Sequence, residues 1–476
     1  MRQYLLIFAQ EHIGFRLPEL RCLLSLLKIK AEYDDRSYDG ESPFLPIKLT
    51  SEKDAKLLMS RSMLAKSLIE LWGHGSSRDE AGKLIESQWQ EEWQQYCQED
   101  VSICFRVNPF GKQINIKDKI DIMEEIAKYL PLEGPVKLTN PDQLFHIYEY
   151  YGLNPNEAPP MPLKVYVGRW IADGQRHLVH RYSIKKRHFI GNTSMDATLA
   201  LIMANMANVT PNMVIFDPFV GTGSLLVGAA HFGAFTLGSD INANVIHGKG
   251  KTSRNNTPNK FRGDDENIRT NMRMYGLESR YIDVLITDFS KNVWREQPMF
   301  DAIITDPPYG LRESTKKVGT EKSYKIREEQ VEAHIPATLG YGLGDILTDL
   351  LEFAVHFLRL HGRLVYWMPT ARSDYTDDMI PHHPCLKLVA NSEQILTSMV
   401  SRRLITMEKC KNLKDLDGYP VKAAIRDNKY QQPNALRDKV YNTGQSQDSD
   451  TELQESTNSQ KDENVKNEFE QAPTCR

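Results

Sequence analysis

The chain has 476 residues, of which 40% are hydrophobic and 26% charged, a balance typical of a globular protein with two or three domains. The formal net charge is −4, but residues 441–476 hold eight acidic against three basic side chains, which leaves +1 for the rest. A nucleic-acid-binding surface would therefore have to be a local basic patch. No stretch reaches the about 20 apolar residues that span a bilayer, so we expect no membrane attachment.

The first 75 residues predict a small α+β domain of ferredoxin-like type. The pattern indicates strands over 4–9 and 44–50, a helix over 17–27, and one long amphipathic helix over 52–72. The short apolar run at the N-terminus is followed directly by Glu11 and His12, so we interpret it as a first strand and not as a signal peptide.

A second block, residues 76–180, alternates like strands over 101–110 and 163–171 and has helical spacing over 116–130 and 141–152. It ends in a run rich in basic and aromatic residues, which continues through a linker over 181–190. This run is a candidate contact for a nucleic-acid backbone, and the alternative is a solvated linker face. The candidate residues are Arg176, Arg181, Lys185, Lys186 and Arg187, accompanied by His177, His180 and His188.

From residue 191 to about 415 the order of apolar and amphipathic segments is typical of an α/β domain. Apolar strands are expected over 212–219, 234–241, 281–289, 300–308 and 362–369, and helices separate most of them. Such alternation predicts a doubly wound, Rossmann-like parallel sheet, and two further strands over 387–396 and 401–409 suit an antiparallel pair at one edge. Residues 416–476 lose apolar periodicity, and we expect a disordered polar and acidic tail.

The cysteines and histidines give no metal pattern. The six cysteines are scattered without a Cys-x-x-Cys pair, which argues against a zinc finger or a disulfide framework and favours the reducing cytoplasm. His382, His383 and Cys385 lie close together, but their segment is more typical of a loop before an edge strand. We therefore expect no metal site in this chain.

The first chemical motif is FDPFVGTGSLL, in which a strand ends at Asp217 and a helix begins near Ser224. Gly221 and Gly223 let the backbone approach a ligand closely, at the sheet edge where open parallel sheets bind ligands. The spacing is not that of a nicotinamide-dinucleotide or Walker phosphate loop. Taken alone, the motif also fits a tight strand-to-helix turn.

Two carboxylates follow at the ends of the next two strands, Asp240 and Asp288. An acidic residue about 20 positions after such glycines can bind both hydroxyls of a ribose. The alternative for each is a helix N-cap or an ordinary polar strand end. Because successive parallel strands place their carboxyl ends at one edge, the glycines and both carboxylates predict a single crevice.

The third motif is ITDPPYG, at the end of the fourth strand of the series. Pro307 and Pro308 fix the backbone, so that Asp306 and the Pro307 carbonyl can accept two hydrogen bonds from one amino group while Tyr309 stacks on a flat ring. This suits a planar base with an exocyclic amine, a poor nucleophile that must be positioned against an electrophilic methyl group. The alternative is a proline-stiffened strand end with a solvated aspartate.

Together these motifs resemble the S-adenosylmethionine (SAM)-dependent amino-methyltransferases of the class I fold. Residues 189–209 resemble the segment before the first strand in tRNA guanine-N2 methyltransferases, and residues 135–191 resemble a THUMP RNA-binding domain joined to it. With the extra N-terminal domain, residues 1–415 are similar to the catalytic subunits of the tRNA methyltransferases that modify guanine 10. Related DNA adenine and protein glutamine enzymes often carry Asn where Asp306 stands, so Asp306 favours the tRNA branch.

The resemblance implies roles for the motif residues. Asp217, Gly221 and Gly223 would surround the methionine part of SAM, Asp240 would bind its ribose and Asp288 its adenine amine. Three residues that precede the first strand would line the cofactor pocket, namely Thr193, Ser194 and Asp196. The catalytic segment would be Asp306, Pro307, Pro308 and Tyr309, which would hold a guanine turned out of its stack. The charged segment 311–336 that follows is expected to be a mobile lid or an RNA contact.

The resemblance also implies a partner, since enzymes of this family need a small zinc-binding activator protein. The third strand, 281–289, lies at an open edge in this fold, and a bare apolar edge favours strand addition. We expect the activator there. Two other functions stay open: a DNA adenine or protein glutamine methyltransferase, and a non-catalytic RNA-binding scaffold.

Overall fold

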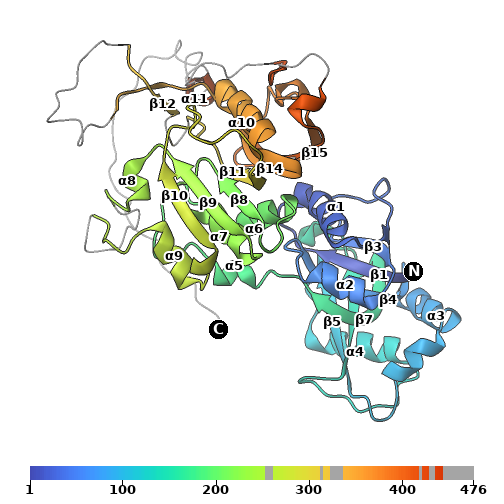
Figure 1. Cartoon of the computed structure of the whole chain (residues 1–476). Helices are drawn as coiled ribbons and strands as arrows, with labels where there is room; N and C mark the ends of the chain where they lie inside the picture. The colour runs from blue at the N-terminus through green and yellow to red at the C-terminus, as the bar shows by residue number, and fades with distance from the viewer. Residues whose placement is uncertain are drawn as a thin grey trace, which may run out of the picture.

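The computed structural model describes residues 1–251, 261–310, 313, 315–321, 336–416, 421–427 and 435–442. Two seven-stranded sheets organise this part of the chain, one in the N-terminal half and one in the C-terminal half (Figure 1). Helix α1 (Arg16–Leu27) lies where the two halves meet and packs on α6 (Ala197–Met206).

The N-terminal sheet has the strand order β2-β3-β1-β4-β7-β6-β5, and helices α1 to α4 cover one of its faces. Strands β5 and β6 pair in parallel, and the other neighbours are antiparallel. The strands are β1 (Arg2–Phe8), β2 (Ala31–Glu32), β3 (Phe44–Leu49), β4 (Ala65–Gly75), β5 (Ile103–Phe110), β6 (Gln143–Tyr150) and β7 (Lys164–Asp173). The remaining helices of this half are α2 (Glu52–Met59), α3 (Arg78–Ser87), α4 (Ile116–Ala127) and the single turn α5 (Leu178–Arg181).

Two secondary-structure predictions in this half are wrong. The long helix expected over 52–72 ends at Met59, and β4 begins at Ala65; the helical segment expected over 141–152 is strand β6. Both strands are buried along most of their length on both faces. Their hydrophobic residues therefore do not alternate with polar ones, and the run resembled a helix.

Strand β4 also joins the two expected N-terminal domains, since it pairs with β1 on one side and with β7 on the other. Residues 1–75 and 76–180 thus contribute to one continuous sheet.

The C-terminal sheet confirms the doubly wound prediction. Its order is β10-β9-β8-β11-β14-β16-β15, with parallel pairing up to β14 and antiparallel pairing for the last two strands. Helices α6 and α7 pack on one face and α10 on the other. The strands are β8 (Val214–Asp217), β9 (Phe235–Asp240), β10 (Tyr281–Ile286), β11 (Phe300–Thr305), β14 (Leu358–Ala371), β15 (Leu386–Ile395) and β16 (Val400–Lys409). The helices are α7 (Ser224–His231), α8 (Ala243–Ile246), α9 (Ile268–Met274), α10 (Leu343–Phe357) and α11 (Ala435–Asn442).

Buried hydrogen bonds connect the N-terminal and C-terminal halves. The carboxylate of Glu19 in α1 accepts hydrogen bonds from the backbone of Met63 and from the side chain of Asn205 in α6. Near the C-terminal sheet, the ring of Phe15 lies 5.9 Å from that of Trp367 on β14. The N-terminal half therefore reaches the C-terminal sheet through packed side chains.

Part of the segment expected to be a disordered tail is folded. Leu436 in α11 is buried in the core beside α10, and Ala424 forms a bridge with His382 just before edge strand β15. The prediction of disorder from residue 416 is thus wrong for residues 421–427 and 435–442, while residues 443–476 lie outside the described chain. Residues 381–385, which include His382, His383 and Cys385, form a loop before edge strand β15, as expected.

The expected lid segment lies largely outside the described residues. Its described part includes β12 (Lys316–Val318), which pairs with β13 (Thr338–Gly340) in a short antiparallel ribbon. Among the helices that the structure describes, none has the length and apolar content to cross a membrane.

Candidate active site

The glycine loop after β8 opens the site. Gly221 and Gly223 have φ angles of 48° and 77°, in the left-handed region that glycine adopts at low cost. A Cβ at Gly223 would lie 2.7 Å from Cγ2 of Ile268, whereas no described atom lies within 4 Å of a Cβ at Gly221. Gly223 is thus needed for packing, and Gly221 borders space that a ligand can approach.

Asp217 lies beneath this loop and is buried. Its Oδ1 accepts hydrogen bonds from the backbone N–H of Phe219 at 3.1 Å and from the hydroxyl of Thr305 at 2.7 Å. Burial, helped by the negative charges of Asp240 and Asp306, raises the pKa of Asp217 to about 7. This carboxyl is therefore ready to ionise when a cation arrives beside it.

The next two strand ends complete a row of carboxylates. Asp240 accepts the N–H of Gly221 on Oδ2 at 2.9 Å, which ties β9 to the glycine loop. Burial raises the pKa of Asp240. Asp288 accepts the N–H of Ser290 on Oδ1 at 2.9 Å and that of Val318 on Oδ2 at 2.7 Å. The carboxylates at or just after the ends of β8, β9 and β10 thus belong to adjacent strands, as predicted, and the β12 ribbon is attached at Asp288.

The residues before the first strand contact the same loop. The Ser194 hydroxyl accepts the N–H of Gly191 at 2.8 Å and pairs with the Thr222 hydroxyl at 2.7 Å, between the two loop glycines. Thr193 donates to the carboxylate of Glu313. Asp196 caps α6 by accepting the N–H of Thr198, and it is exposed.

The DPPY segment follows β11, between β8 and β14. The Tyr309 hydroxyl donates to Oδ1 of Asp306, and Nη1 of Arg402 lies 3.3 Å from Oδ2. Burial raises the pKa of Asp306 to about 6, against the opposing charge of Arg402. Burial also raises the pKa of Tyr309 well above its usual value, so its hydroxyl stays protonated and can donate.

Sequence reasoning missed two residues of this site, Thr305 and Arg402. Thr305 is the last residue of β11 and is fully buried against Asp217. Arg402 comes from β16, 96 residues after Asp306. The one sequence signal for Arg402 is that it forms a pair with Arg403 at the start of a predicted strand.

Family models match both halves of the chain. A Tmrp11 THUMP N-terminal domain matches residues 2–176, and an RMKL-like methyltransferase domain matches residues 185–340. A tRNA (guanine(10)-N(2))-methyltransferase TRMT11 from Xenopus laevis is 48% identical over 441 residues, which cover 92% of this chain and 91% of the relative. The human TRMT11 is 47% identical over 445 residues, covering 93% and 95%, and the Dictyostelium discoideum protein is 34% identical, covering 86% and 82%.

The chain belongs to the TRMT11 family. It is therefore a SAM-dependent methyltransferase. Solved structures similar to it include TrmN from Thermus thermophilus, at 17% identity and a TM-score of 0.41, covering 86% of this chain and 99% of that one. SMU.472 complexed with SAH gives 11% identity and a TM-score of 0.38, covering 87% and 99%.

The site of this TRMT11-family chain fits SAM. Gly221 borders open space, Asp217 at the start of the same loop is a buried carboxyl that a cation would ionise, and Asp240 and Asp288 follow at the next two strand ends. Negative charge of this kind stabilises a sulfonium and an ammonium group, and a carboxylate can accept hydrogen bonds from ribose hydroxyls.

The basic run that was expected to contact RNA divides into exposed and buried members. Arg187 is 1% exposed, and it donates to the hydroxyl of Ser224 at 2.7 Å and to the carbonyl of Tyr182 at 3.1 Å. The expectation of an RNA contact is thus wrong for Arg187, which instead anchors the start of α7. Lys185, Lys186 and Arg181 are exposed, and Arg176 pairs with Glu11 at 2.9 Å.

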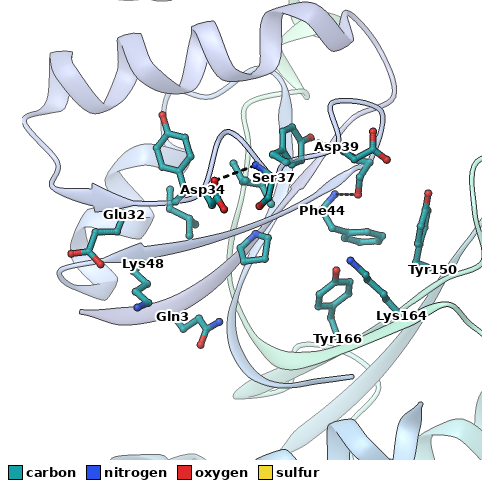
Figure 2. Close-up of a pocket in the computed structure, with 16 residues that line it drawn as sticks. Gln3, Glu32, Asp34, Ser37, Asp39, Phe44, Lys48, Tyr150, Lys164 and Tyr166 are labelled. Atoms are coloured by element: carbon teal, nitrogen blue, oxygen red, sulfur yellow. Dashed lines mark hydrogen bonds between the residues drawn. The ribbon is translucent and has the colours of Figure 1, made fainter. Parts of the chain in front are cut away.

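A cavity of about 630 Å³ lies elsewhere, on the N-terminal sheet. Figure 2 shows Phe44, Tyr150, Tyr166 and Lys164 near one another at its wall. Acidic side chains of Glu32, Asp34 and Asp39 also line it, so its charge does not favour a phosphate backbone. The residues that carry the methyltransferase chemistry are not among its lining residues.

Proposed function

We propose that this chain transfers one methyl group from SAM to the exocyclic N2 amine of guanosine 10 in tRNA. The observation that carries the proposal is the Asp306 carboxyl, held by Tyr309 and Arg402 at the end of β11 beside the glycine loop. The TRMT11 relatives, which bear the name of this activity at 47–48% identity, support it.

When bound, SAM supplies the electrophilic methyl group. Asp306 accepts a hydrogen bond from the guanine N2 amine and orients its lone pair, because each carboxylate oxygen keeps a second lone pair beside Tyr309 or Arg402. Methyl transfer to the N2 nitrogen would break the sulfur–methyl bond of SAM, and Asp306 would take the proton that N2 then loses and pass it to solvent. Tyr309 stacks on the base, and Pro307 and Pro308 keep the segment rigid.

Three groups of residues would hold the cofactor. Asp217 with the glycine loop takes the methionine part, Asp240 takes the ribose hydroxyls and Asp288 takes the adenine amine. The residues before the first strand complete the pocket, namely Thr193, Ser194 and Asp196. The contacts of Ser194 with Gly191 and Thr222 support this placement, since they fix that segment against the loop.

The tRNA would be recognised by the THUMP-containing half. Lys185, Lys186 and Arg181 lie in the linker between the two halves, Arg176 lies just before it, and all four would contact phosphates near the target guanosine. The target base must leave its stack to reach Asp306. Although they share one sheet, we assign residues 1–75 to an N-terminal α+β domain and 76–180 to the THUMP domain, followed by the linker over 181–190 and the methyltransferase domain over 191–415.

A small zinc-binding activator would form the heterodimer through β10. This strand is an edge of the sheet, as expected, and Ile282, Leu285 and Ile286 are between 38% and 46% exposed on it. Such apolar exposure at an unpaired edge favours strand addition by a partner. We place the complex in the cytoplasm, because all five cysteines that the structure describes are free thiols.

The test is methyl transfer from labelled SAM to unmodified total tRNA, with and without a co-expressed activator, followed by nuclease digestion. Wild type should yield N2-methylguanosine, and Asp306→Ala should yield none while still binding SAM. Label in DNA adenine or in protein glutamine would instead support the related amino-methyltransferases. A folded complex that neither binds SAM nor transfers methyl would leave an RNA-binding scaffold.

A further inference from the structure

Arg402 is held on several sides next to the DPPY segment. It lies on β16, opposite Pro369 of β14 and Gln394 of β15. Its Nη1 lies 3.3 Å from Oδ2 of Asp306, and its Nε donates to Oε1 of Gln394 at 2.8 Å. The guanidinium also lies over the ring of Trp367, 4.0 Å from the centroid. Only 13% of the side chain is exposed, so the group has little freedom to turn away.

We propose that Arg402 is the positioning residue of Asp306, which it keeps ionised and aimed at the amine of the target base. The proposal rests on the function proposed above and extends it to a residue on a different strand. Arg402 occupies one oxygen of the carboxylate and Tyr309 the other, so the plane of the carboxylate is fixed by two donors. A fixed and charged acceptor orients the amine without further reorganisation.

The surroundings of Asp306 oppose its ionisation, so a nearby cation is needed to keep the carboxylate charged. Its burial and the charge of Glu313 raise its pKa, and it interacts unfavourably with Asp217 at the end of β8. Tyr309 contributes a neutral donor. Among the described groups that act on Asp306, Arg402 is the cation that opposes these effects. Without it, Asp306 would hold a proton into the neutral range, and a protonated carboxyl has lost acceptor capacity.

The same arginine connects the site to the N-terminal half. The ring of Trp367, on which it lies, has its centroid 5.9 Å from that of Phe15, and the pKa of nearby His12 is lowered mainly by burial and further by the charge of Arg402. His12 and Phe15 lie at the two ends of a short 3-10 turn directly before α1. The N-terminal half therefore buttresses the residue that holds Asp306.

A purely structural role, in which Arg402 only ties β16 to the loop after β11, makes a different prediction. Loss of a structural tie lowers the rate by a similar factor at every pH. Loss of a charge that keeps Asp306 ionised lowers the rate mainly at acidic pH, because the carboxyl ionises by itself at alkaline pH. The pH profile of the methyl-transfer step therefore separates the two.

The experiment compares wild type with Arg402→Gln, Arg402→Lys and Arg403→Gln, each as the full chain with the co-expressed activator. Arg403 is a matched control, since it also lies over an aromatic ring, that of Tyr375, and pairs with Glu393, but away from Asp306. Single-turnover transfer to tRNA at saturating SAM is measured across pH. We expect the acid midpoint of Arg402→Gln to rise by about one pH unit, which lowers the rate about tenfold on the acid side.

The two remaining variants should keep the wild-type midpoint, Arg402→Lys because it retains the charge and Arg403→Gln because Asp306 is untouched. A rate of Arg402→Gln that is unchanged, or lowered equally at every pH, would overturn the proposal.

A second readout does not depend on catalysis. Melting temperatures of Arg402→Gln, Asp306→Asn and the double variant are compared at about pH 8 and about pH 5. We expect the double variant at the higher pH to melt above the value that the two single shifts predict, and this coupling to shrink at the lower pH. Additive shifts at both pH values would refute the ion pair even if tRNA were not the substrate. Coupling without any N2-methylguanosine from wild type would instead refute the proposed function alone.

Discussion

The hydroxyl of Thr305 donates to the carboxylate of Asp217 at 2.7 Å, although the two residues lie on adjacent strands 88 positions apart in sequence. Both side chains are almost completely buried beneath the glycine loop. The pKa of Asp217 is raised to about 7 mainly by burial, and the Thr305 donor opposes that rise. Asp217 is therefore only partly ionised near neutral pH, and a cation bound beside it would favour the ionised form.

This relationship predicts that SAM affinity increases with pH. A cation beside Asp217 favours the ionised form, so binding below pH 7 must release a proton, and the dissociation constant should rise by up to about tenfold for each pH unit below 7. Thr305→Val removes the donor and should move this dependence to higher pH. Asp217→Asn should bind SAM weakly with little pH dependence. Calorimetry in buffers of different ionisation enthalpy measures the proton release.

Protein stability supplies the control for this prediction. Since the pKa of Asp217 in the folded protein lies above that of an unfolded aspartate, its contribution to stability is present below about pH 4 and is lost as the pH rises to about 7. Asp217→Asn should therefore gain stability relative to wild type over this range, as measured by urea unfolding without SAM. An equal difference at all pH values, together with pH-independent SAM binding by wild type, would contradict the assignment.

The C-terminal sheet was predictable because its physical cause is local. Parallel strands buried on both faces form continuous apolar runs, and their carboxyl ends share one edge, which brought Asp217, Asp240 and Asp288 together correctly. Strands β4 and β6 in the other half are also buried on both faces, and for this reason their hydrophobic runs are easily mistaken for helices.

The polar partners of the site were not predictable in the same way. Period-two alternation places Arg402 and Arg403 on opposite faces of β16, but nothing in the sequence says which of them meets Asp306. In the basic linker, the sequence could not show which residue is buried, because Arg187 carries the same charge as Lys185 and Lys186. Only the packing of α7 against the linker shows that the arginine is buried.

The two loop glycines should respond differently to alanine. Gly223→Ala adds a left-handed residue and a Cβ 2.7 Å from Ile268, so we expect a loss of about 3 kcal/mol of unfolding free energy. Gly221→Ala meets no described atom within 4 Å and should cost only about 1 kcal/mol. Its methyl group would nevertheless project into the space assigned to SAM, so SAM binding should fall sharply. Chemical unfolding and calorimetry test both; normal SAM binding by a folded Gly221→Ala protein would argue against the assigned pocket.

The linker also offers a matched comparison of exposed and buried basic residues. Replacing Lys185 and Lys186 together by Gln should leave stability unchanged and reduce the slope of log affinity for tRNA against log salt by about 2. Arg187→Gln should instead cost about 2 kcal/mol of stability, because buried hydrogen bonds to Ser224 and Tyr182 are lost. Filter binding over a salt series and thermal unfolding measure the two effects. An unchanged salt slope for the lysine variant would remove this patch from the tRNA surface.

Charge placed on the free edge of the C-terminal sheet should prevent heterodimer formation. Leu285 on β10 is 38% exposed, and a lysine there would meet the backbone and apolar face of an added strand. We expect Leu285→Lys to fold alone and to lose the co-purifying activator. The control is Leu388→Lys on β15, the opposite edge of the same sheet, where the leucine is 45% exposed. Size-exclusion chromatography with mass analysis distinguishes the outcomes. A complex that survives Leu285→Lys but not Leu388→Lys would move the interface to β15.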